Sequence, residues 1–472
     1  MLEQRASSDA PAVYADDNLW TGRELIERAA GAADFLDEVD APIGRPVAAL
    51  LSSTPAAFAL SIGAAATDRA LAPLGPRLTV NELVPLVAAL DGDVIVTEPA
   101  HESVANDVAD RTGRRVALLT SASRSTRDLS FDIAADRPAA ILHTSGTTGA
   151  PKAVYCRQDR LAARTLVNAE LVGLGPGAIY ASASPFHHIA GIGMLFVAMG
   201  SGAALMPLPR FDLDAWGGLA ARGATHVLIV PTMVEMLLDA GRLSLPGLQV
   251  LQYGGASIHP DTLARAMAAM PGVRFVSIFG QTEGSPITCL TMNDHVLAAT
   301  GRPDLLESVG RAVPGIEVTI ADADQHGVGE IVARGAHLFQ PGDDGWLRTG
   351  DLGRLDDDGY VYLSGRRGDK IIRGGENVYP LEIETVLAQH PDVAEVCVFG
   401  VPDRRWGEVV AAAVVVRGGV LADFEELRLF ARERLASFKV PTTWEQTDAL
   451  PRNVAGKVLR RDLVAARSAR DE

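Results

Sequence analysis

The apolar and polar positions of the first 300 residues alternate between short apolar runs and longer stretches with helical spacing. The strand-like runs lie at 46–51, 93–97, 139–142, 225–230, 248–253 and 274–279. The helical stretches lie at 19–38, before Ala66, after the capping box Thr79–Glu82, at 233–240 and at 260–270. This alternation predicts layered α/β subdomains with a largely parallel sheet.

The pattern changes after about residue 300, where short strands and Gly/Asp turns predict a β-rich subdomain that closes the large lobe. The segment 365–369 is bracketed by glycines and charged, which suits a linker. Beyond it, two helices and two strands predict a compact α+β lobe. We therefore expect a large N-terminal domain over 1–364, a hinge at 365–369 and a small mobile domain over 370–472.

Composition narrows the classes of function. The 472 residues are 47% hydrophobic and 22% charged, as in globular proteins of two or three lobes, and the net charge is −16. This charge disfavours nucleic acid and anionic membranes as partners. Cys156, Cys289 and Cys397 are isolated, which predicts neither disulfides nor a zinc site and fits the cytoplasm. Glycines and Ser201 interrupt the uncharged stretch 189–208, so we expect a helix, a break and a strand rather than a membrane span.

One loop concentrates the residue types that hold phosphate. Thr144 to Lys152 follows the strand at 139–142 and combines hydroxyl side chains, two glycines and a lysine. Glycine lets backbone N–H groups approach an anion, and lysine adds a point charge. The spacing does not fit a Walker loop. Taken alone, the segment is either a phosphate-binding loop or an ordinary Gly/Thr-rich turn.

Four further stretches place reactive side chains after predicted strands or turns. They are Ser184-Pro-Phe-His-His-Ile-Ala-Gly191, Phe279-Gly-Gln-Thr-Glu283, Trp346-Leu-Arg-Thr-Gly-Asp351 and Pro451-Arg-Asn-Val-Ala-Gly-Lys457. With the loop at 144–152, they resemble the ordered motifs of the adenylate-forming superfamily, from about Leu19 to Leu463. Within it, Arg373-Gly-Gly-Glu-Asn-Val-Tyr-Pro380 and Asp403-Arg-Arg-Trp-Gly-Glu408 are most similar to bacterial acyl-CoA ligases.

This resemblance implies activation of a carboxylic acid with ATP and Mg²⁺. Glu283 and Thr147 would hold Mg²⁺, and Asp351 with Arg366 would bind the ribose. Lys457 would be catalytic, because an ammonium stabilises the charge that builds on the α-phosphate during carboxylate attack. The implied ATP contacts are Thr144, Ser145, Gly146, Thr147, Thr148, Gly149, Lys152, Gly255, Ala256, Ser257, Phe279, Gly280, Gln281, Thr282, Asp351, Arg366 and Lys457.

The implied acid pocket contains neither arginine nor lysine. Its expected lining is Phe186, His188, Met194, Pro231, Met233, Val234, Tyr253, Gly254, Gln281 and Ile287. A second carboxylate would be buried there without a cation, which is costly. We therefore expect an uncharged medium-chain, branched, alicyclic or aromatic acid. His188 would border the reacting carboxylate, where amino-acid-activating relatives carry aspartate; the alternative for His187 and His188 is a hydrogen-bonded core pair.

The resemblance also implies a second half-reaction, in which the small lobe turns and the acyl group passes to CoA. The residues expected at the CoA site are Arg373, Gly374, Gly375, Glu376 and Lys439, with Arg404 and Arg405 as further phosphate partners. Gly368 stands where the family hinge is commonly Asp or Lys. Alternative acceptors are a carrier-protein thiol, an amine or a small nucleophile such as nitrite. A non-catalytic nucleotide sensor is the alternative class, disfavoured because Glu283 and Lys457 are retained. The chain would act as a monomer or homodimer.

Overall fold

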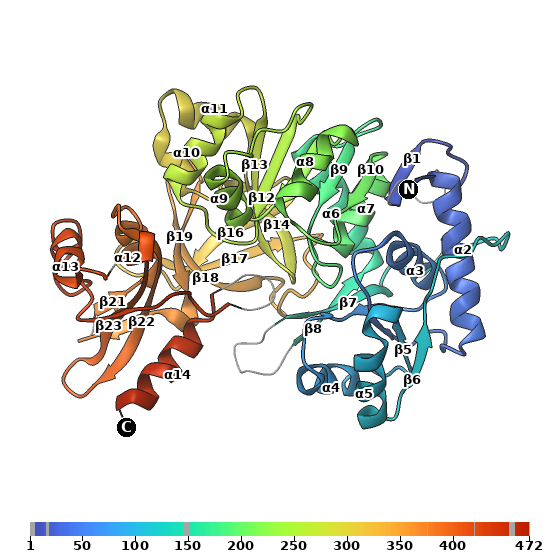
Figure 1. Cartoon of the computed structure of the whole chain (residues 1–472), viewed down its shortest axis with the longest axis horizontal. Helices are drawn as coiled ribbons and strands as arrows, with labels where there is room; N and C mark the ends of the chain where they lie inside the picture. The colour runs from blue at the N-terminus through green and yellow to red at the C-terminus, as the bar shows by residue number, and fades with distance from the viewer. Residues whose placement is uncertain are drawn as a thin grey trace.

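The computed structural model describes residues 5–15, 18–144, 152–374, 376–419, 421–452 and 458–471. Two large sheets and a four-stranded sheet form a large lobe, and a five-stranded sheet forms a smaller one (Figure 1). The predicted α/β fold with a large N-terminal and a small C-terminal part is confirmed. The exact boundaries at 364 and 370 stay a prediction.

The first large sheet has the strand order β6-β5-β3-β4-β7-β8, and its members are parallel except for β8. Its strands are β3 (Val47–Leu50), β4 (Leu71–Pro73), β5 (Val94–Thr97), β6 (Arg115–Leu118), β7 (Pro138–Thr144) and β8 (Lys152–Arg157). Its helices are α2 (Gly22–Glu38), α3 (Pro55–Ala66), α4 (Val80–Ala88) and α5 (Glu102–Thr112). Thr79 and Glu82 form the predicted capping box at the start of α4.

The second large sheet has the order β15-β14-β13-β12-β11-β9-β10-β1-β2. Its strands are β1 (Pro11–Ala15), β2 (Asn18–Thr21), β9 (Ile179–Ser182), β10 (Ala204–Pro207), β11 (His226–Ile229), β12 (Val250–Gly254), β13 (Arg274–Gln281), β14 (Gly284–Leu290) and β15 (Arg311–Ala312). Its helices are α6 (Gln158–Val172), α7 (Ile192–Ser201), α8 (Leu213–Ala221), α9 (Pro231–Asp239), α10 (Pro260–Ala269) and α11 (Met292–Thr300).

The uncharged stretch 189–208 folds as predicted into helix α7, a break and strand β10. Gly202 makes the break possible, because its φ of 87° is a conformation that favours glycine. Helices α2, α3 and α7 bury their apolar faces in one core shared by the two large sheets. Helices α8, α9 and α10 cover the other face of the nine-stranded sheet. No helix in the described ranges is long and apolar enough to cross a membrane.

The β-rich subdomain is an antiparallel sheet of β16 (Ile316–Ala321), β17 (Gly329–Gly335), β18 (Leu347–Leu355) and β19 (Val361–Arg366). The expected small-residue turn before Asp351 is wrong, since this residue lies within β18. Pairing with β17 and β19 on both sides keeps the segment extended, and Gly350, with a φ of 71°, kinks the strand locally.

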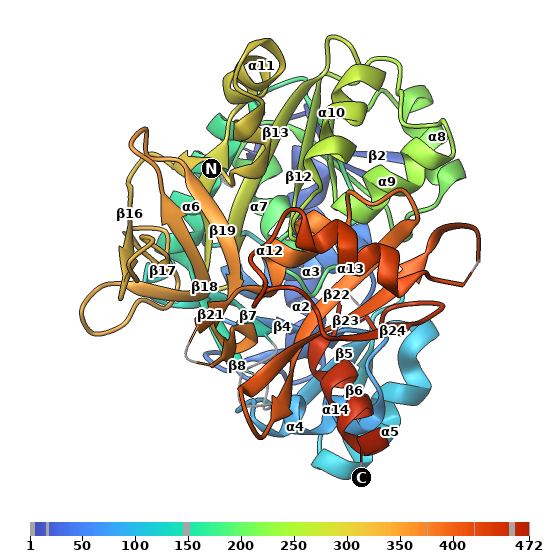
Figure 2. The ribbon, with the colours of Figure 1, turned by 90° about the vertical axis from the view of Figure 1, so that its left-hand side faces the viewer.

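The smaller lobe packs beside the β16–β19 sheet, and Figure 2 shows it in front of the large lobe. Its strands are β20 (Ile371–Arg373), β21 (Glu376–Val378), β22 (Val393–Asp403), β23 (Gly407–Val416) and β24 (Thr443–Gln446). Its helices are α12 (Pro380–Leu387), α13 (Phe424–Arg432) and α14 (Arg460–Asp471). They cover a core of their own, as the α+β pattern predicted.

Candidate active site

The carboxyl ends of the two large sheets meet at one seam. Ser53, after β3, donates its hydroxyl hydrogen to the carbonyl of Ser184, after β9 (3.1 Å). A Cβ atom placed on Gly75, after β4, would lie 3.1 Å from Nε2 of His187. Ligands of open α/β sheets bind outside the carboxyl ends of the strands. The seam is therefore the expected place for a substrate.

Thr144 and Glu283 bring the phosphate loop and the predicted metal ligand together. Thr144 ends β7, and its hydroxyl lies 3.3 Å from Oε1 of Glu283 in the turn between β13 and β14. Thr144 also pairs with Lys152 across β7 and β8, so both ends of the loop are placed here. The residues between them that were predicted to bind ATP, namely Ser145, Gly146, Thr147, Thr148 and Gly149, lie outside the described residues.

The donor set at this point fits Mg²⁺. A carboxylate and a hydroxyl are hard oxygen ligands, which Mg²⁺ prefers, and the ion usually binds through one or two carboxylates together with substrate phosphates. Glu283 would hold the ion beside the loop, with Thr144 as its hydrogen-bonding neighbour. The ion would supply positive charge to the triphosphate.

The predicted ribose clamp is assembled across β18 and β19. Arg366 Nε lies 2.7 Å from Asp351 Oδ1, and Arg366 Nη1 donates to the carbonyl of Thr349 (3.3 Å). The hydroxyl of Thr349 accepts from the backbone N–H of Asp351 (3.0 Å). Asp351 is buried while Arg366 is partly exposed. The carboxylate is thus held in one orientation at the edge of the large lobe.

His187 and His188 lie with their ring centroids 4.3 Å apart at an angle of 44°. Both ring nitrogens of His187 and Nε2 of His188 find no hydrogen-bond partner among the described residues. Burial, followed by the charges of His188 and Arg77, lowers the pKa of His187 to about 3, and burial lowers the pKa of His188. Both rings are therefore neutral near pH 7. The hydrogen-bonded core pair is not what the structure shows.

His143 is a third histidine with buried ring nitrogens, and the sequence reasoning missed it. It precedes Thr144 on β7, neither of its ring nitrogens has a partner in the described ranges, and burial lowers its pKa. The signal was present, because a histidine ends an otherwise apolar run. Unpaired buried polar atoms cost about 1–3 kcal/mol each, so rings in this state are typical of a ligand site.

The neutral state of His187 predicts an acid-sensitive fold. Above pH 6.5 the ring is neutral in the folded and unfolded chain, so its contribution is constant. Below pH 6.5 the ring binds a proton in the unfolded chain. In the folded chain it stays neutral until the pH falls to about 3. The free energy of unfolding should then fall by up to about 1.4 kcal/mol per pH unit through this group.

Urea unfolding of His187→Gln between pH 7 and pH 5 tests this expectation. The variant should lose less stability on acidification than the parent. His326→Gln is the matched control, because His326 is exposed. An unchanged pH dependence in His187→Gln would contradict the assignment.

The predicted acid-pocket residues are divided between two cores. Phe186, Met194 and Ile287 are buried in the core between the large sheets, whereas Val234 and Tyr253 are buried under α8–α10. The hydroxyl of Tyr253 is bonded to His295 (2.9 Å). The residues at the carboxyl edge are Pro231, Met233, Gly254, Gly255, Ala256, Ser257, Phe279, Gly280, Gln281 and Thr282. The lining of the pocket stays a prediction.

The predicted CoA residues surround an exposed indole. Gly374 has a φ of 60°, and a Cβ atom there would meet the ring of Trp406 at 2.8 Å. The guanidinium groups of Arg373 and Arg405 lie 5.9 and 5.0 Å from that ring, and Trp406 is 42% exposed. Sequence reasoning assigned Trp406 no role, although an aromatic residue between two arginines and a glycine signals a stacking surface.

Two other predicted CoA residues lie differently. Lys439 is bound by both carboxylate oxygens of Glu382 (2.6 and 2.7 Å), so its charge is already matched within the small lobe. Glu376 begins β21, opposite Arg373 on β20. Gly375 lies outside the described residues.

The predicted hinge is anchored on both sides. Arg367 binds the buried carboxylate of Glu330 on β17 (2.9 Å), which belongs to the large lobe. Asp369 is bound instead by Arg460 at the start of α14, in the small lobe. Gly368 stands between these two attachments, and a Cβ atom there would meet nothing within 4 Å. Gly368 can therefore absorb a change of φ and ψ between the two attachments without a side-chain clash.

Lys457 belongs to the segment 453–457, which lies outside the described residues. Its flanking residues Arg452 and Val458 pair as an antiparallel bridge, and Arg452 binds Glu395. Burial first, and then the charges of Glu395 and Asp239, raise the pKa of Glu235 on α9, while Arg452 opposes them. The charge of Arg452, next to the lysine segment, thus acts on α9, the helix that begins at the carboxyl end of β11.

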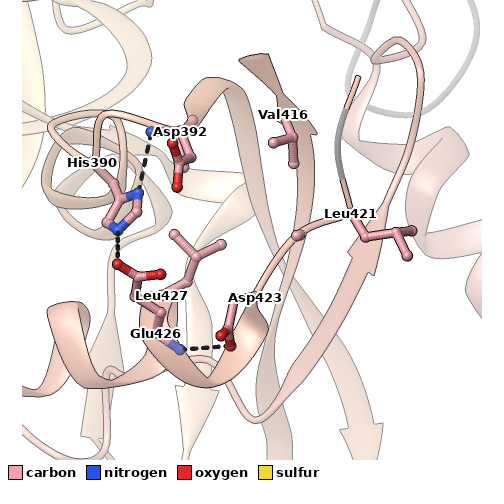
Figure 3. A pocket seen from close by; sticks show the side chains of 9 residues that line it. His390, Asp392, Val416, Leu421, Asp423, Glu426 and Leu427 are labelled. Carbon is pink, nitrogen blue, oxygen red and sulfur yellow. Dashed lines mark hydrogen bonds and ion pairs between the residues drawn. The ribbon is translucent and has the colours of Figure 1, made fainter. Parts of the chain in front are cut away.

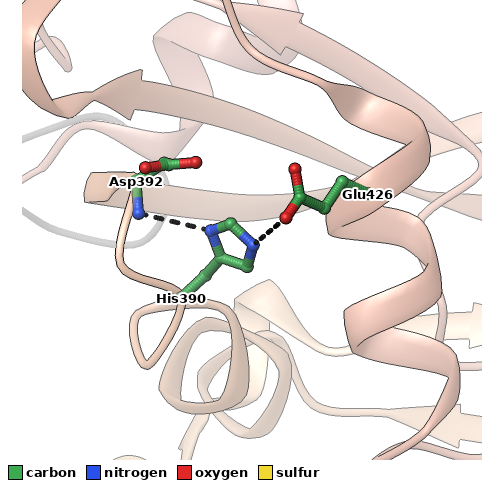
Figure 4. A group of neighbouring side chains, drawn as sticks. All are labelled: His390, Asp392 and Glu426. Atoms are coloured by element: carbon green, nitrogen blue, oxygen red, sulfur yellow. Dashed lines mark hydrogen bonds and ion pairs between the residues drawn. The ribbon is translucent and has the colours of Figure 1, made fainter.

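A separate hollow lies on the small lobe and is lined by residues of 390–427 (Figure 3). It contains His390, Asp392 and Glu426, which are close enough to share an ion (Figure 4). His390 Nδ1 accepts from the backbone N–H of Asp392 (3.3 Å), so a neutral ring carries its hydrogen on Nε2, which faces Glu426 at 3.7 Å. With Nδ1 accepting from Asp392 and the hydrogen on Nε2, the neutral ring offers no free nitrogen lone pair, so we assign no metal site to this group.

Comparison with known proteins matches the large lobe and the small lobe to two separate family models. Residues 2–341 match the family described as AMP-binding enzyme, and residues 382–457 match the AMP-binding enzyme C-terminal domain. The chain is 31% identical to the fatty acid–[acyl-carrier-protein] ligase ScoC of Streptomyces coeruleorubidus, over 96% of this chain and 92% of that one. It is 30% identical to the 2-succinylbenzoate–CoA ligase of Bacillus cereus, over 98% and 97%.

The crystal structure of ATP-bound MatB from Rhodopseudomonas palustris superimposes on the whole chain with a TM-score of 0.91, at 28% identity and 99% coverage of that protein. The predictions of an AMP-forming acid ligase with ATP, Mg²⁺ and CoA as its small-molecule partners are confirmed by these matches. The alternative of a non-catalytic nucleotide sensor is not supported. The chain belongs to the AMP-binding, adenylate-forming enzyme family.

Proposed function

We propose that this enzyme activates an uncharged, apolar carboxylic acid as its acyl-adenylate and transfers the acyl group to the thiol of CoA. The observation that carries the adenylation step is the contact between Thr144 and Glu283, which joins the phosphate loop to the metal ligand. The ribose clamp of Asp351 and Arg366 stands beside the hinge to the small lobe. The domains 1–364 and 370–472 would turn about residues 365–369.

The neutral histidines support an uncharged acid. His187, His188 and His143 offer hydrogen bonds without a positive charge, because burial keeps their pKa values low. The expected pocket positions at the carboxyl edge add no cation. A second carboxylate would therefore lose its hydration without gaining a partner. Three buried free cysteines fit a reducing compartment, and we place the reaction in the cytoplasm.

Pyrophosphate exchange with a panel of acids tests this proposal. Medium-chain, branched, alicyclic and aromatic acids should support exchange, and malonate and amino acids should not. A strong preference for malonate would overturn the assignment of an uncharged acid. Exchange with none of the acids would overturn adenylation of a carboxylate.

The acceptor is tested separately, because the relative ScoC is named for a carrier protein. AMP release from enzyme, acid and ATP should rise when CoA is added, and the thioester should appear in equal amount. Acceleration by a phosphopantetheinylated carrier protein, with none by CoA, would favour the carrier-protein thiol. An amine or nitrite would instead leave a product without a thioester.

Trp406 should serve the thiol acceptor and not the adenylation step. Its exposed ring lies within 6 Å of two guanidinium groups, 5.9 Å from that of Arg373 and 5.0 Å from that of Arg405. A purine or a pantetheine arm can pack on such a surface. Trp406→Ala is expected to raise the KM for CoA about tenfold, since one stacking contact contributes about 1–3 kcal/mol. Pyrophosphate exchange should be unchanged. Leu429→Ala, at an exposed residue of α13, is the control; equal effects in both variants would contradict the role.

A further inference from the structure

Besides the hinge, a side-chain hydrogen bond between described residues joins the two lobes directly. Tyr379, at the N-terminal end of α12 in the small lobe, donates its hydroxyl hydrogen to Oδ2 of Asp324 (3.1 Å). Asp324 lies in the turn between β16 and β17 of the large lobe. The bond therefore exists only while the small lobe keeps the orientation described here.

The acceptor side of this bond is preorganised. Oδ1 of Asp324 accepts from the backbone N–H groups of His326 (2.8 Å) and Val328 (3.1 Å), which fixes the carboxylate in its turn. Burial alone would raise the pKa of Asp324, but these bonds and that from Tyr379 outweigh it and lower the pKa. The acceptor is thus a charged carboxylate near pH 7, and hydrogen bonds to charged groups are the stronger kind.

The donor side is neutral and well placed. Burial, followed by the charge of Asp324, raises the pKa of Tyr379 to about 12, so the hydroxyl keeps its hydrogen. Tyr379 follows the point at which the chain changes lobes, because Arg367 is bound to Glu330 in the large lobe and Asp369 to Arg460 in the small one. A turn of the backbone at Gly368 would move Tyr379 away from Asp324.

We propose that Tyr379 is a positioning residue for adenylation: its hydrogen bond to Asp324 holds the small lobe in the orientation described here, in which the whole chain matches an ATP-bound relative. Turning of the lobe toward thioester formation breaks this bond. The two half-reactions then depend on one equilibrium between two lobe orientations. The bond shifts this equilibrium toward the orientation for adenylation. This inference rests on the proposed function.

Tyr379→Phe tests it by removing only the hydroxyl. Pyrophosphate exchange should fall about tenfold to a hundredfold, the size of one hydrogen bond to a charged group. Thioester formation from preformed acyl-adenylate and CoA should be unchanged or faster. In an Asp324→Ala background, Tyr379→Phe should cause no further loss, because the acceptor is already gone.

Tyr360→Phe is the matched control. It removes the hydroxyl that Tyr360 donates to Asp294 (2.7 Å), a tyrosine–aspartate bond that stays within the large lobe. It should leave the ratio of the two half-reactions at the parent value. A fall of both half-reactions by the same factor in Tyr379→Phe would mean a general structural role and would overturn the proposal.

The lobe orientation can also be measured without turnover. The three native cysteines are buried, so fluorophores can be directed to cysteines introduced at the exposed residues Asp107 of α5 and Arg432 of α13. Tyr379→Phe should reduce the fraction of molecules that show the parent's energy-transfer efficiency, by about the same factor as it reduces pyrophosphate exchange. Unchanged energy transfer together with unchanged pyrophosphate exchange would overturn the positioning role of Tyr379. Absence of exchange in the parent enzyme would instead refute the proposed function, so the two failures are distinguishable.

Discussion

Lys457→Ala is expected to lower adenylation, measured as pyrophosphate exchange, by about 10²–10³-fold. Negative charge builds on the oxygens of the α-phosphate as the carboxylate attacks, and an ammonium placed there stabilises that charge more than it stabilises bound ATP. The bridge between Arg452 and Val458 and the effect of the Arg452 charge on Glu235 of α9 support delivery of this lysine to the seam. The expected loss is the size typical of removing one electrostatic donor.

The same variant should be nearly normal in the other half-reaction. Thioester formation from preformed acyl-adenylate and CoA requires no cation at the α-phosphate, so its rate should stay close to that of the parent. Arg461→Ala, at an exposed cation of α14, is the control for a general loss of charge in the small lobe. Near-normal exchange in Lys457→Ala would end the assignment of this residue to adenylation.

The local sequence pattern was enough to predict the structural features that depend only on neighbouring residues. The capping box of Thr79 and Glu82, the break at Gly202 and the helix after Asp423 all depend on side chains and backbone within a few positions of one another. The strand β18 was missed, because Gly350 interrupts its apolar alternation and the segment is extended only through pairing with β17 and β19. Propensity is overridden there by neighbours far away in sequence.

The contacts between side chains of the candidate site could not be predicted from the local sequence pattern. Motif order suggested that Thr144 and Glu283 act together, but only the folded seam places their oxygens 3.3 Å apart. The bond from Tyr379 to Asp324 could not be predicted either, because Tyr379 stands in the motif at 373–380 but nothing in the sequence pairs it with Asp324. Predicted pocket residues such as Phe186 and Tyr253 are buried in different cores, because Phe186 lies in the connection between β9 and α7 while Tyr253 points from β12 toward α8–α10.

Glu283→Gln should lower pyrophosphate exchange about 100-fold and raise the Mg²⁺ concentration needed for half-maximal exchange. The substitution keeps the size of the side chain and an oxygen that can accept from Thr144, so the contact across the seam should persist. It removes the negative charge through which a carboxylate binds the ion, and a neutral amide is a weaker ligand for Mg²⁺. The loss should therefore shrink as the Mg²⁺ concentration is raised.

Two comparisons separate a metal ligand from a structural carboxylate at this position. Glu317→Gln, at an exposed residue of β16 paired with Arg334, should leave both exchange and its Mg²⁺ dependence unchanged. Glu283→Gln should also match the parent in thermal unfolding without ligands, because the hydrogen bond from Thr144 remains. A loss of exchange that is independent of Mg²⁺, together with a lower unfolding temperature, would assign Glu283 to the packing of the β13–β14 turn. The phosphate loop would then need another group to hold its ion, and the carboxyl edge of β13 would lose its part in the reaction.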